Sequence, residues 1–304
     1  TPILPRISNP GLDYISPKKF LSYSLTDFNR IFLENTPVCH FQQKNLVLID
    51  VANGHMRALY DSAKTAKEKY GDKIVLMIGN VANPKTFAEY CSIGVDYIRI
   101  GIGNGGGCLT TQQTGVGYPM ASLIEACFSQ SMELSTPAKI VADGGFKKYA
   151  DVIKALALGA DYVMIGSMFN KALESAGENY IQTSESTSTM RYEDYANSFK
   201  DVWEAPGIPV PTLQDVMTLG ILYKKFRGMS TKEVQKSLGN DVLKTSEGVV
   251  KYQKVEYTLK GWCDNFEHYL RSAMSYTGKR TLEEFIGGVY TLKITPNAFN
   301  RYNK

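Results

Sequence analysis

A glycine-rich segment that ends in a cysteine is the part of this sequence best suited to chemistry. Residues 101–108 read Gly-Ile-Gly-Asn-Gly-Gly-Gly-Cys, directly after an apolar stretch, and Thr110 follows. Glycines add chain entropy and no side chains to pack, so they are useful where backbone groups must approach a ligand or an ion, although a flexible turn has the same composition. Once deprotonated, Cys108 can attack an electrophilic ring carbon; the alternative is a buried structural thiol.

Carboxylates and glycines also follow other apolar stretches. Asp143 precedes two glycines that end at Gly145. Its carboxylate can accept two hydrogen bonds from a sugar diol, or it can cap the next helix. Asp50 and Asn53 follow an earlier apolar stretch. They can face a cofactor, or Asn53 can cap a helix.

Three later segments are informative only in combination. Gly166 and Ser167 end an apolar stretch, where backbone N–H groups can bind phosphate. Residues 227–230 form a short polar loop, and Glu247 lies in another, where it can act as a general base only in a perturbing environment. A dinucleotide or P-loop cradle is disfavoured at 101–108, because no helix opens directly behind the glycines and no Gly-Lys-Ser/Thr follows.

An alternation of apolar and helical segments must position these residues. Apolar runs of this kind are typical of a parallel sheet covered on both faces, and their alternation with helices indicates successive βα units. We expect strands at 3–7, 20–25, 46–51, 74–79, 97–102, 139–142 and 162–166. We expect helices at 26–35, 55–70, 84–93, 119–130 and 149–158.

A doubly wound sheet and a (β/α)8 TIM barrel fit this periodicity equally well. The barrel is favoured because Asp50, Asn80, Gly103, Asp143 and Gly166 all lie at carboxyl ends of strands, which converge on one mouth in a barrel. The expected strands leave the barrel one short, so the first strand is expected before residue 1 or from a companion N-terminal segment.

Residues 1–304 are expected to form one barrel domain with two irregular parts. The βα rhythm stops after the seventh expected strand. Residues 170–222 contain a Ser/Thr-rich run and a proline-bearing stretch, which predict an inserted excursion or flap. Residues 231–250 are expected to be a mobile active-site segment.

Composition excludes several classes of protein. The net charge of +4 is too small for a nucleic-acid-binding surface, and no apolar run approaches the roughly 18 residues of a membrane span. No signal peptide is recognisable at the start. Five cysteines without a CxxC pair and three histidines without metal-ligand spacing disfavour a disulfide scaffold and a zinc site. A cytoplasmic, reducing location is expected.

Taken together, six segments resemble the IMP dehydrogenase/GMP reductase family over about residues 1–290. They occur in the family's order: 50–54 (Asp-Val-Ala-Asn-Gly), 79–81 (Gly-Asn-Val), 101–110 (the cysteine loop), 142–145 (Ala-Asp-Gly-Gly), 164–167 (Met-Ile-Gly-Ser) and 227–230 (Arg-Gly-Met-Ser). Residues 50–54 and 114–119 look like the GMP reductase branch. No regulatory domain is inserted between the second and third strands, unlike in most dehydrogenases.

The resemblance implies a (β/α)8 barrel that assembles as a homotetramer and reduces GMP to IMP and ammonia with NADPH. Cys108 matches the nucleophile that attacks C2 of the purine, and Thr110 and Glu247 match the pair that handles the proton. The matched substrate contacts are Asp143, Gly145, Gly166, Ser167, Gly228, Met229 and Ser230. Asp50, Gly101 and Gly103 match the family's nicotinamide side, and Asn53 is assigned to the cofactor with them. The backbone carbonyls of Gly103, Gly105 and Cys108 match a potassium site.

The sequence departs from the family at the expected phosphate site. Gly106 stands where the family has a serine that donates to phosphate, and Phe226 stands where a tyrosine is common; Arg227 could compensate electrostatically. Residues 231–246 lack the Arg-Tyr pair of the dehydrogenase flap, which favours a reductase. The alternatives are an NAD-dependent IMP dehydrogenase that forms XMP, and a catalytically silent purine-nucleotide-binding member.

Overall fold

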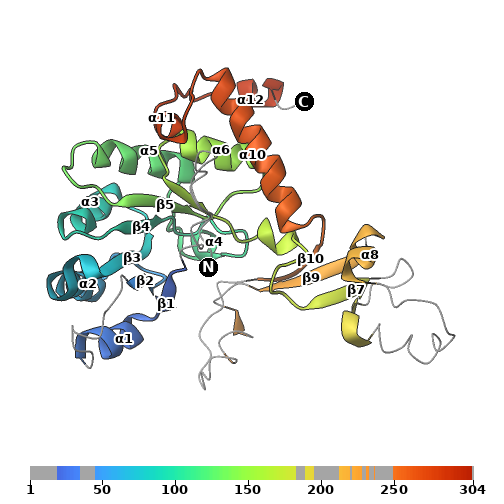
Figure 1. Cartoon of the computed structure of the whole chain (residues 1–304), viewed down its shortest axis with the longest axis horizontal. Helices are drawn as coiled ribbons and strands as arrows, with labels where there is room; N and C mark the ends of the chain where they lie inside the picture. The colour runs from blue at the N-terminus through green and yellow to red at the C-terminus, as the bar shows by residue number, and fades with distance from the viewer. Residues whose placement is uncertain are drawn as a thin grey trace.

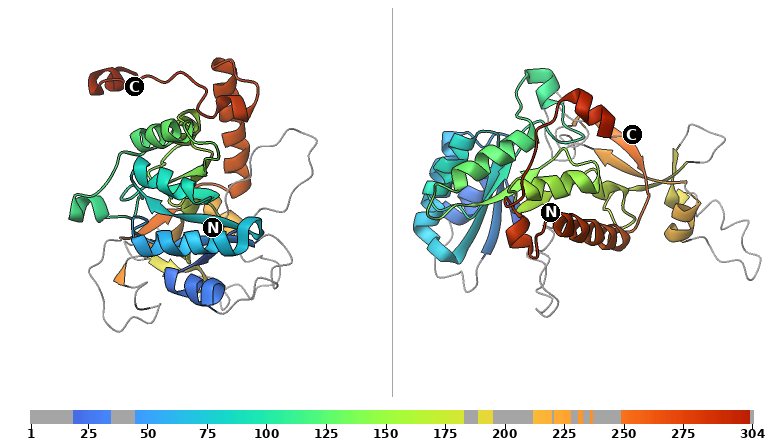
Figure 2. Two further views of the ribbon diagram at one scale, coloured as in Figure 1. Left: turned by 90° about the vertical axis from the view of Figure 1, so that its left-hand side faces the viewer. Right: turned by 90° about the horizontal axis from the view of Figure 1, so that it is seen from above.

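The computed structural model of the protein describes residues 19–34, 45–182, 189–194, 212–219, 221–227, 231–232, 236 and 249–302. Two sheets are present in these parts (Figure 1): a six-stranded parallel sheet with helices packed on it, and a four-stranded antiparallel sheet. Figure 2 shows that the antiparallel sheet extends away from the helices that cover the parallel sheet.

The parallel sheet carries the expected βα units in chain order. Its strands are β1 (Leu21–Tyr23), β2 (Asn45–Asp50), β3 (Ile74–Val81), β4 (Tyr97–Ile100), β5 (Lys139–Asp143) and β6 (Tyr162–Met164), each hydrogen-bonded to the next. The connecting helices are α1 (Leu25–Phe28), α2 (Arg57–Tyr70), α3 (Pro84–Ser92), α4 (Thr110–Thr114), α5 (Met120–Ser131) and α6 (Tyr149–Ala157). This sequential order of neighbours confirms the predicted α/β class with barrel-type βα units. Within the described residues β1 and β6 are the two edges, and the ring is not closed.

Alternation along the strands gives the sheet two unlike faces. One face carries Ile49, Ile78 and Ile98 into the large core beneath the helices. The other carries a smaller apolar cluster near the amino ends of the strands, which includes Leu48 and Met77. Toward the carboxyl ends of the strands this second face carries Asp50, Arg99 and Asp143, so a polar site lies at that end of the sheet.

The antiparallel sheet lies in a region where no strand was expected from the sequence. Its order is β10-β9-β7-β8, formed by β10 (Val250–Lys254), β9 (Leu222–Arg227), β7 (Asn179–Gln182) and β8 (Thr189–Arg191). Helix α8 (Leu213–Thr218) packs Val216 against Ile181 and Leu222 in a small separate core. The described part of 170–222 therefore joins β9 and β10 in one folded unit.

The carboxyl-terminal helices return to the parallel sheet. Helix α10 (Leu259–Tyr276) packs beside α6, where the rings of Tyr149 and Trp262 lie 5.2 Å apart, and α11 (Leu282–Phe285) and α12 (Pro296–Tyr302) follow. Beyond α11, the ring of Phe128 from α5 fills the space against two glycines. A Cβ built at Gly159 would lie 2.2 Å from this ring, and one at Gly287 would lie 2.1 Å from it. The ring is therefore clamped between two positions that admit no side chain.

Two expectations about elements need comment. The strand expected at 3–7 lies outside the described residues. The helix expected at 26–35 begins as α1 but continues as a π-helical segment over Asn29–Glu34, which places Phe28 and Phe32 in stacked contact at 5.0 Å in the core. In the part of the chain that the structure describes, no helix combines the length and the apolar character that crossing a bilayer requires.

Candidate functional site

Arg99 lies at the centre of a charged cluster on the inner face of the parallel sheet. The strand register aligns Asp50 of β2, Gly79 of β3 and Arg99 of β4 in one row. Because Gly79 has no side chain, the guanidinium reaches across β3 and donates to Asp50 Oδ1 at 2.8 Å. A Cβ built at Gly79 would lie 2.4 Å from Arg99 Cβ, so this crossing requires a glycine.

Asn80 and Asp143 complete the cluster. Arg99 Nε donates to Asn80 Oδ1 at 2.5 Å and lies 3.3 Å from Asp143 Oδ2. Asn80 Nδ2 donates to Asp143 Oδ2 at 2.9 Å and to the Gly101 carbonyl at 2.7 Å. One guanidinium and one amide therefore fix the orientation of both carboxylates and of the loop that follows β4.

Burial and charge act on Asp143 in opposite directions. Burial, the largest effect, raises the pKa of this carboxyl, while Arg99 and the hydrogen bond from Asn80 lower it and the nearby Asp50 raises it. Its side chain is a quarter exposed, at 25%. The Asp143 carboxylate is thus a hydrogen-bond acceptor with a fixed orientation at the carboxyl end of β5, and its exposed part can accept from a polar ligand.

The predicted nucleophile and its neighbour are brought together in the loop after β4. Cys108 Sγ donates to Thr110 Oγ1 at 3.2 Å, and the Cys108 thiol is only partly buried. The Cys108 N–H donates to the Gly105 carbonyl at 3.0 Å and so closes a tight turn. The thiol is therefore accessible, oriented by its own turn, and next to a hydroxyl that accepts its hydrogen bond.

Close backbone packing joins the cysteine loop to the turn after β5. A Cβ at Gly144 would lie 2.9 Å from the Gly105 nitrogen, and a Cβ at Gly145 would lie 3.4 Å from the Asn104 carbonyl oxygen. At Gly103, φ is +81° and a Cβ would overlap the Thr111 hydroxyl, so no other residue fits there. Cys108 and the Asp143 turn consequently form one continuous surface.

Ser167 and the antiparallel sheet approach the same loop from the other side. A Cβ at Gly106 would lie 3.4 Å from Ser167 Oγ, and a Cβ at Gly166 would meet none of the described residues within 4 Å. Val249, just before β10, donates its N–H to the Gly107 carbonyl at 3.2 Å, and Lys251 Nζ donates to the Gly106 carbonyl at 3.3 Å. The loop is thus bounded by β6 on one side and β10 on the other.

The segment after β2 is a structured turn. Asn53 Oδ1 accepts from the His55 N–H at 3.0 Å, and His55 Nε2 accepts from the Ala82 N–H at 3.1 Å. Nδ1 then bears the proton toward Thr86 Oγ1 at 3.0 Å. Burial lowers the pKa of His55, with Glu89 opposing. Asn53 therefore shapes the turn that follows Asp50.

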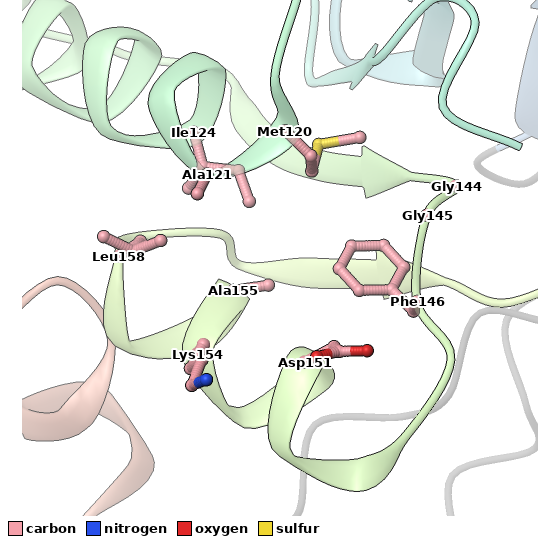
Figure 3. Close-up of a pocket in the computed structure, with 10 residues that line it drawn as sticks. All are labelled: Met120, Ala121, Ile124, Gly144, Gly145, Phe146, Asp151, Lys154, Ala155 and Leu158. Atoms are coloured by element: carbon pink, nitrogen blue, oxygen red, sulfur yellow. The ribbon is translucent and has the colours of Figure 1, made fainter. Parts of the chain in front are cut away.

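A mostly apolar cavity of about 190 Å³ lies between α5 and α6, behind the turn after β5 (Figure 3). Met120 and Phe146 line it together with Gly144 and Gly145. Its one carboxylate, Asp151, already accepts from the Lys147 and Lys148 N–H groups at 3.0 and 3.2 Å. The cavity touches the site only through the glycines.

Four predicted site residues lie outside the described residues: Glu247, Gly228, Met229 and Ser230. The described residues bring the others to the carboxyl ends of β2, β4, β5 and β6. They contain no group of three or more His, Cys, Asp or Glu side chains arranged to hold a metal ion.

Comparison with known proteins agrees with this arrangement. The family model described as "IMP dehydrogenase / GMP reductase domain" matches residues 34–200. The chain belongs to the IMP dehydrogenase/GMP reductase family. The TIM barrel of this family accounts for the sequential parallel strands and for a polar site at their carboxyl ends.

The proteins to which this chain is similar include IMP dehydrogenases and GMP reductases. It is 41% identical to an IMP dehydrogenase of Chlorobaculum parvum over 137 residues, which is 45% of this chain and 27% of that protein. It is 31% identical to that of Chlorobaculum tepidum, over 83% of this chain and 45% of that protein. It is 27% identical to the GMP reductase of Caenorhabditis elegans, over 88% and 64% of the two chains. The chain thus spans less than two thirds of each of these relatives.

Sequence reasoning overlooked Arg99 as a site residue and gave Asn80 no role beyond its strand end. A signal for Arg99 was present, because it is the one charge in the strand Tyr-Ile-Arg-Ile. Period-two alternation places it on the face opposite Ile98 and Ile100, hence with Asp50 and Asp143. A lone charge inside an apolar strand indicates a buried partner.

Proposed function

We propose that the protein is an NADPH-dependent GMP reductase, which converts GMP to IMP and ammonia through a covalent bond between Cys108 and C2 of the purine. The observation that carries the proposal is the 3.2 Å contact between Cys108 Sγ and Thr110 Oγ1, at the carboxyl end of β4 and beside the Asp143 turn. This is a nucleophile hydrogen-bonded to an adjacent hydroxyl, at the position where barrel enzymes act.

The proposed chemistry divides one difficult substitution into two easier steps. The Cys108 sulfur bonds to C2, which is electrophilic between two ring nitrogens, and the thiol proton passes to the ring nitrogen that receives the displaced electron pair. The C2–N bond then breaks, and Thr110 with Glu247 delivers the proton that ammonia takes with it. When C2 is reduced, the C–S bond breaks and the thiolate leaves with the electron pair. Overall, GMP, NADPH and two protons give IMP, ammonium and NADP⁺.

The remaining residues bind and orient the nucleotide in this proposal. Asp143 accepts hydrogen bonds from the ribose hydroxyls, for which its fixed and partly exposed carboxylate is suited. Gly145, Gly166 and Ser167 contact the phosphate, and the loop of Gly228, Met229 and Ser230 reads the base edge.

The residues on the cofactor side fit a nicotinamide. Asp50 keeps 44% of its side chain exposed although Oδ1 accepts from Arg99 and Oδ2 accepts from Ser22 Oγ at 3.4 Å, and each carboxylate oxygen can accept a second hydrogen bond, here from a carboxamide N–H. In this proposal Gly101 and Gly103 contribute backbone groups to the cofactor side, and Asn53 supports the turn after Asp50. When bound, NADPH supplies the hydride that reduces C2.

The carbonyls of Gly103, Gly105 and Cys108 fit a potassium ion, because neutral carbonyl oxygens from one tight loop are a donor set that monovalent cations prefer. Gly105 already accepts from Cys108, which holds the loop in shape. We propose further that the protein acts in the cytoplasm as a homotetramer, as one barrel domain with the 170–222 insertion. Most of the 231–250 segment lies outside the described residues.

The first experiment is absorbance of NADPH with GMP, with and without potassium, together with an assay of released ammonia. Loss of the nicotinamide band matched by ammonia supports the reductase. The second candidate is an IMP dehydrogenase, favoured by the 41% and 31% identities to two such enzymes. NADH formed from IMP and NAD would identify it. Nucleotide binding without turnover in either assay would instead identify a silent family member.

Replacing Cys108 by serine tests the covalent step. The serine retains the shape of the side chain but is a much weaker nucleophile, so we expect kcat to fall about 10³-fold or more with the melting temperature unchanged. The control is Cys263→Ser on α10, a partly buried cysteine remote from the site, which should retain activity. Normal turnover by Cys108→Ser would refute the covalent mechanism.

A further inference from the structure

The antiparallel sheet supplies a cation to the loop in which the family's phosphate-binding serine is replaced. Lys251 Nζ donates to the Gly106 carbonyl at 3.3 Å, although the two residues are 145 positions apart in the chain. The neighbouring contact from the Val249 N–H to the Gly107 carbonyl, at 3.2 Å, holds the start of β10 against the same loop. Two successive contacts fix this approach.

The register of β9 and β10 decides which charged side chain faces the loop. Lys251 pairs with Phe226, so the two side chains share one face of the sheet. Arg227 pairs with Val250 and lies on the other face, which Tyr252 and Tyr180 cover with rings 5.0 Å apart. Of the two cations, Lys251 is therefore the one aimed at Gly106.

The face that carries Lys251 packs against the segment just beyond Ser167. Gln253, two residues along the same face, accepts from Asn170 Nδ2 at 2.9 Å. Lys224, which pairs with Gln253, donates to the Ser175 carbonyl at 2.6 Å. The orientation of β10 is thus set by buried polar contacts, and Lys251 is positioned by them.

Among the described residues, few hydroxyl groups line the space that Lys251 borders. Gly106 contributes no side chain, a Cβ at Gly166 would meet none of the described residues within 4 Å, and the Ser167 hydroxyl lies close to both. Neither Gly106 nor Phe226 carries a hydroxyl, so neither side chain can donate to a ligand here. A dianionic phosphate in this space would need another donor.

We propose that Lys251 binds the 5′-phosphate of the purine nucleotide, in the role of the hydroxyl donors that Gly106 and Phe226 lack. This inference rests on the proposed nucleotide function and adds a specificity residue to it. The ammonium supplies three donors and a positive charge at the rim of the Gly106–Ser167 space. Because Lys251 is exposed, it can leave the Gly106 carbonyl for a phosphate oxygen at little desolvation cost.

The test measures calorimetric binding of GMP, IMP, guanosine and inorganic phosphate to the whole chain without cofactor. We expect Lys251→Met to weaken GMP binding about 10-fold or more, as for loss of a charged hydrogen bond, and to leave guanosine within about 2-fold. Lys251→Arg should retain most of the affinity. The control is Lys254→Met. Lys254 lies on the same strand but pairs with Tyr223 on the face opposite to Lys251, so this variant should bind GMP like the unaltered protein.

A second arm restores the missing hydroxyl. Gly106→Ser has room, since its Cβ would lie 3.4 Å from Ser167 Oγ, an ordinary contact. In that background Lys251→Met should cost GMP binding less than it does alone, because the serine shares the phosphate.

Equal GMP binding by Lys251→Met and the unaltered protein overturns the assignment of Lys251. Equal loss of GMP and guanosine also overturns it, because the change then acts through the fold. If the unaltered protein binds neither GMP nor IMP, the proposed function fails, and this inference with it. The three results are distinguishable in one set of titrations.

Discussion

Arg99 in the parallel sheet is a mostly buried cation and Lys224 in the antiparallel sheet a fully buried one, with 11% of the Arg99 side chain and 3% of Lys224 exposed. Arg99 contacts the two carboxylates Asp50 and Asp143 and the Asn80 amide. Lys224 donates to one backbone carbonyl, that of Ser175, and burial lowers its pKa, with Glu174 opposing.

The two sheets therefore differ in how their cations are compensated. In the parallel sheet the carboxylates and the guanidinium hold one another in place. The guanidinium reaches Asp50 across β3 at Gly79, where there is no side chain. In the antiparallel sheet the buried charge is weakly compensated, and the nearby cation, Lys251, extends on a long side chain. The parallel sheet can hold reacting groups in fixed geometry, whereas the long Lys251 side chain of the antiparallel sheet can change its conformation to reach a ligand.

Removing the Arg99 charge should give the largest effect. Arg99→Met leaves Asp50 and Asp143 close together without their cation; because Asp143 is mostly buried but Asp50 is 44% exposed, we expect a loss of about 2–3 kcal/mol, between those of exposed and buried ion pairs. Urea unfolding at pH 7 measures it. The matched control is Lys139→Met, which removes a half-exposed ion pair with Asp161 and should cost under about 1 kcal/mol. Equal losses in the two variants would show that Arg99 is not a structural centre.

Adding a side chain at Gly79, next to Arg99, should lower the free energy of unfolding by a smaller amount. In Gly79→Ala the new Cβ would lie 2.4 Å from Arg99 Cβ, so β3 and β4 must shift; overpacking of this kind costs about 1–3 kcal/mol. Gly166→Ala, whose Cβ meets none of the described residues within 4 Å, is the control for stability and should change it little. A fully stable Gly79→Ala protein would mean that the guanidinium has a second path.

The parallel sheet was predictable because its signals are local. Runs such as 46–51 and 74–79 are continuously apolar and flanked by helical segments, so β2 and β3 agree with the expected strands within two residues. The Cys108–Thr110 contact follows from two positions in one loop. The role of Arg99 depends on register between three strands, which no local pattern specifies.

The antiparallel sheet was not predictable for the converse reason. β9 and β10 are rich in lysine and tyrosine and short in apolar residues, and β9 pairs with β7 across more than 40 positions. Their stability comes from tertiary contacts such as those of Gln253 and Lys224, which only the folded chain provides. The same contacts aim Lys251, so its role could not be inferred from the sequence.

Replacing the other buried cation should have the smallest effect. Lys224→Met removes one hydrogen bond and one desolvated charge and leaves no carboxylate unpaired, so we expect a change within about 1 kcal/mol at pH 7. The pKa of Lys224 is lowered on folding, so the unfolded chain binds the proton more tightly. The unaltered protein should therefore gain stability relative to Lys224→Met as pH rises toward the ordinary lysine value. Unfolding curves from pH 7 to 10 measure this, and parallel pH profiles for the two proteins would contradict it.

The clamp on Phe128 has a consequence for how this sequence can change over time. The ring is held by Gly159 from one side and Gly287 from the other, from segments 128 positions apart, and a Cβ at either glycine would overlap it. A larger residue at 159 or 287 is therefore tolerable only after position 128 has become smaller. Among descendants of this chain the three positions should vary together, and a phenylalanine at 128 should be inherited with both glycines.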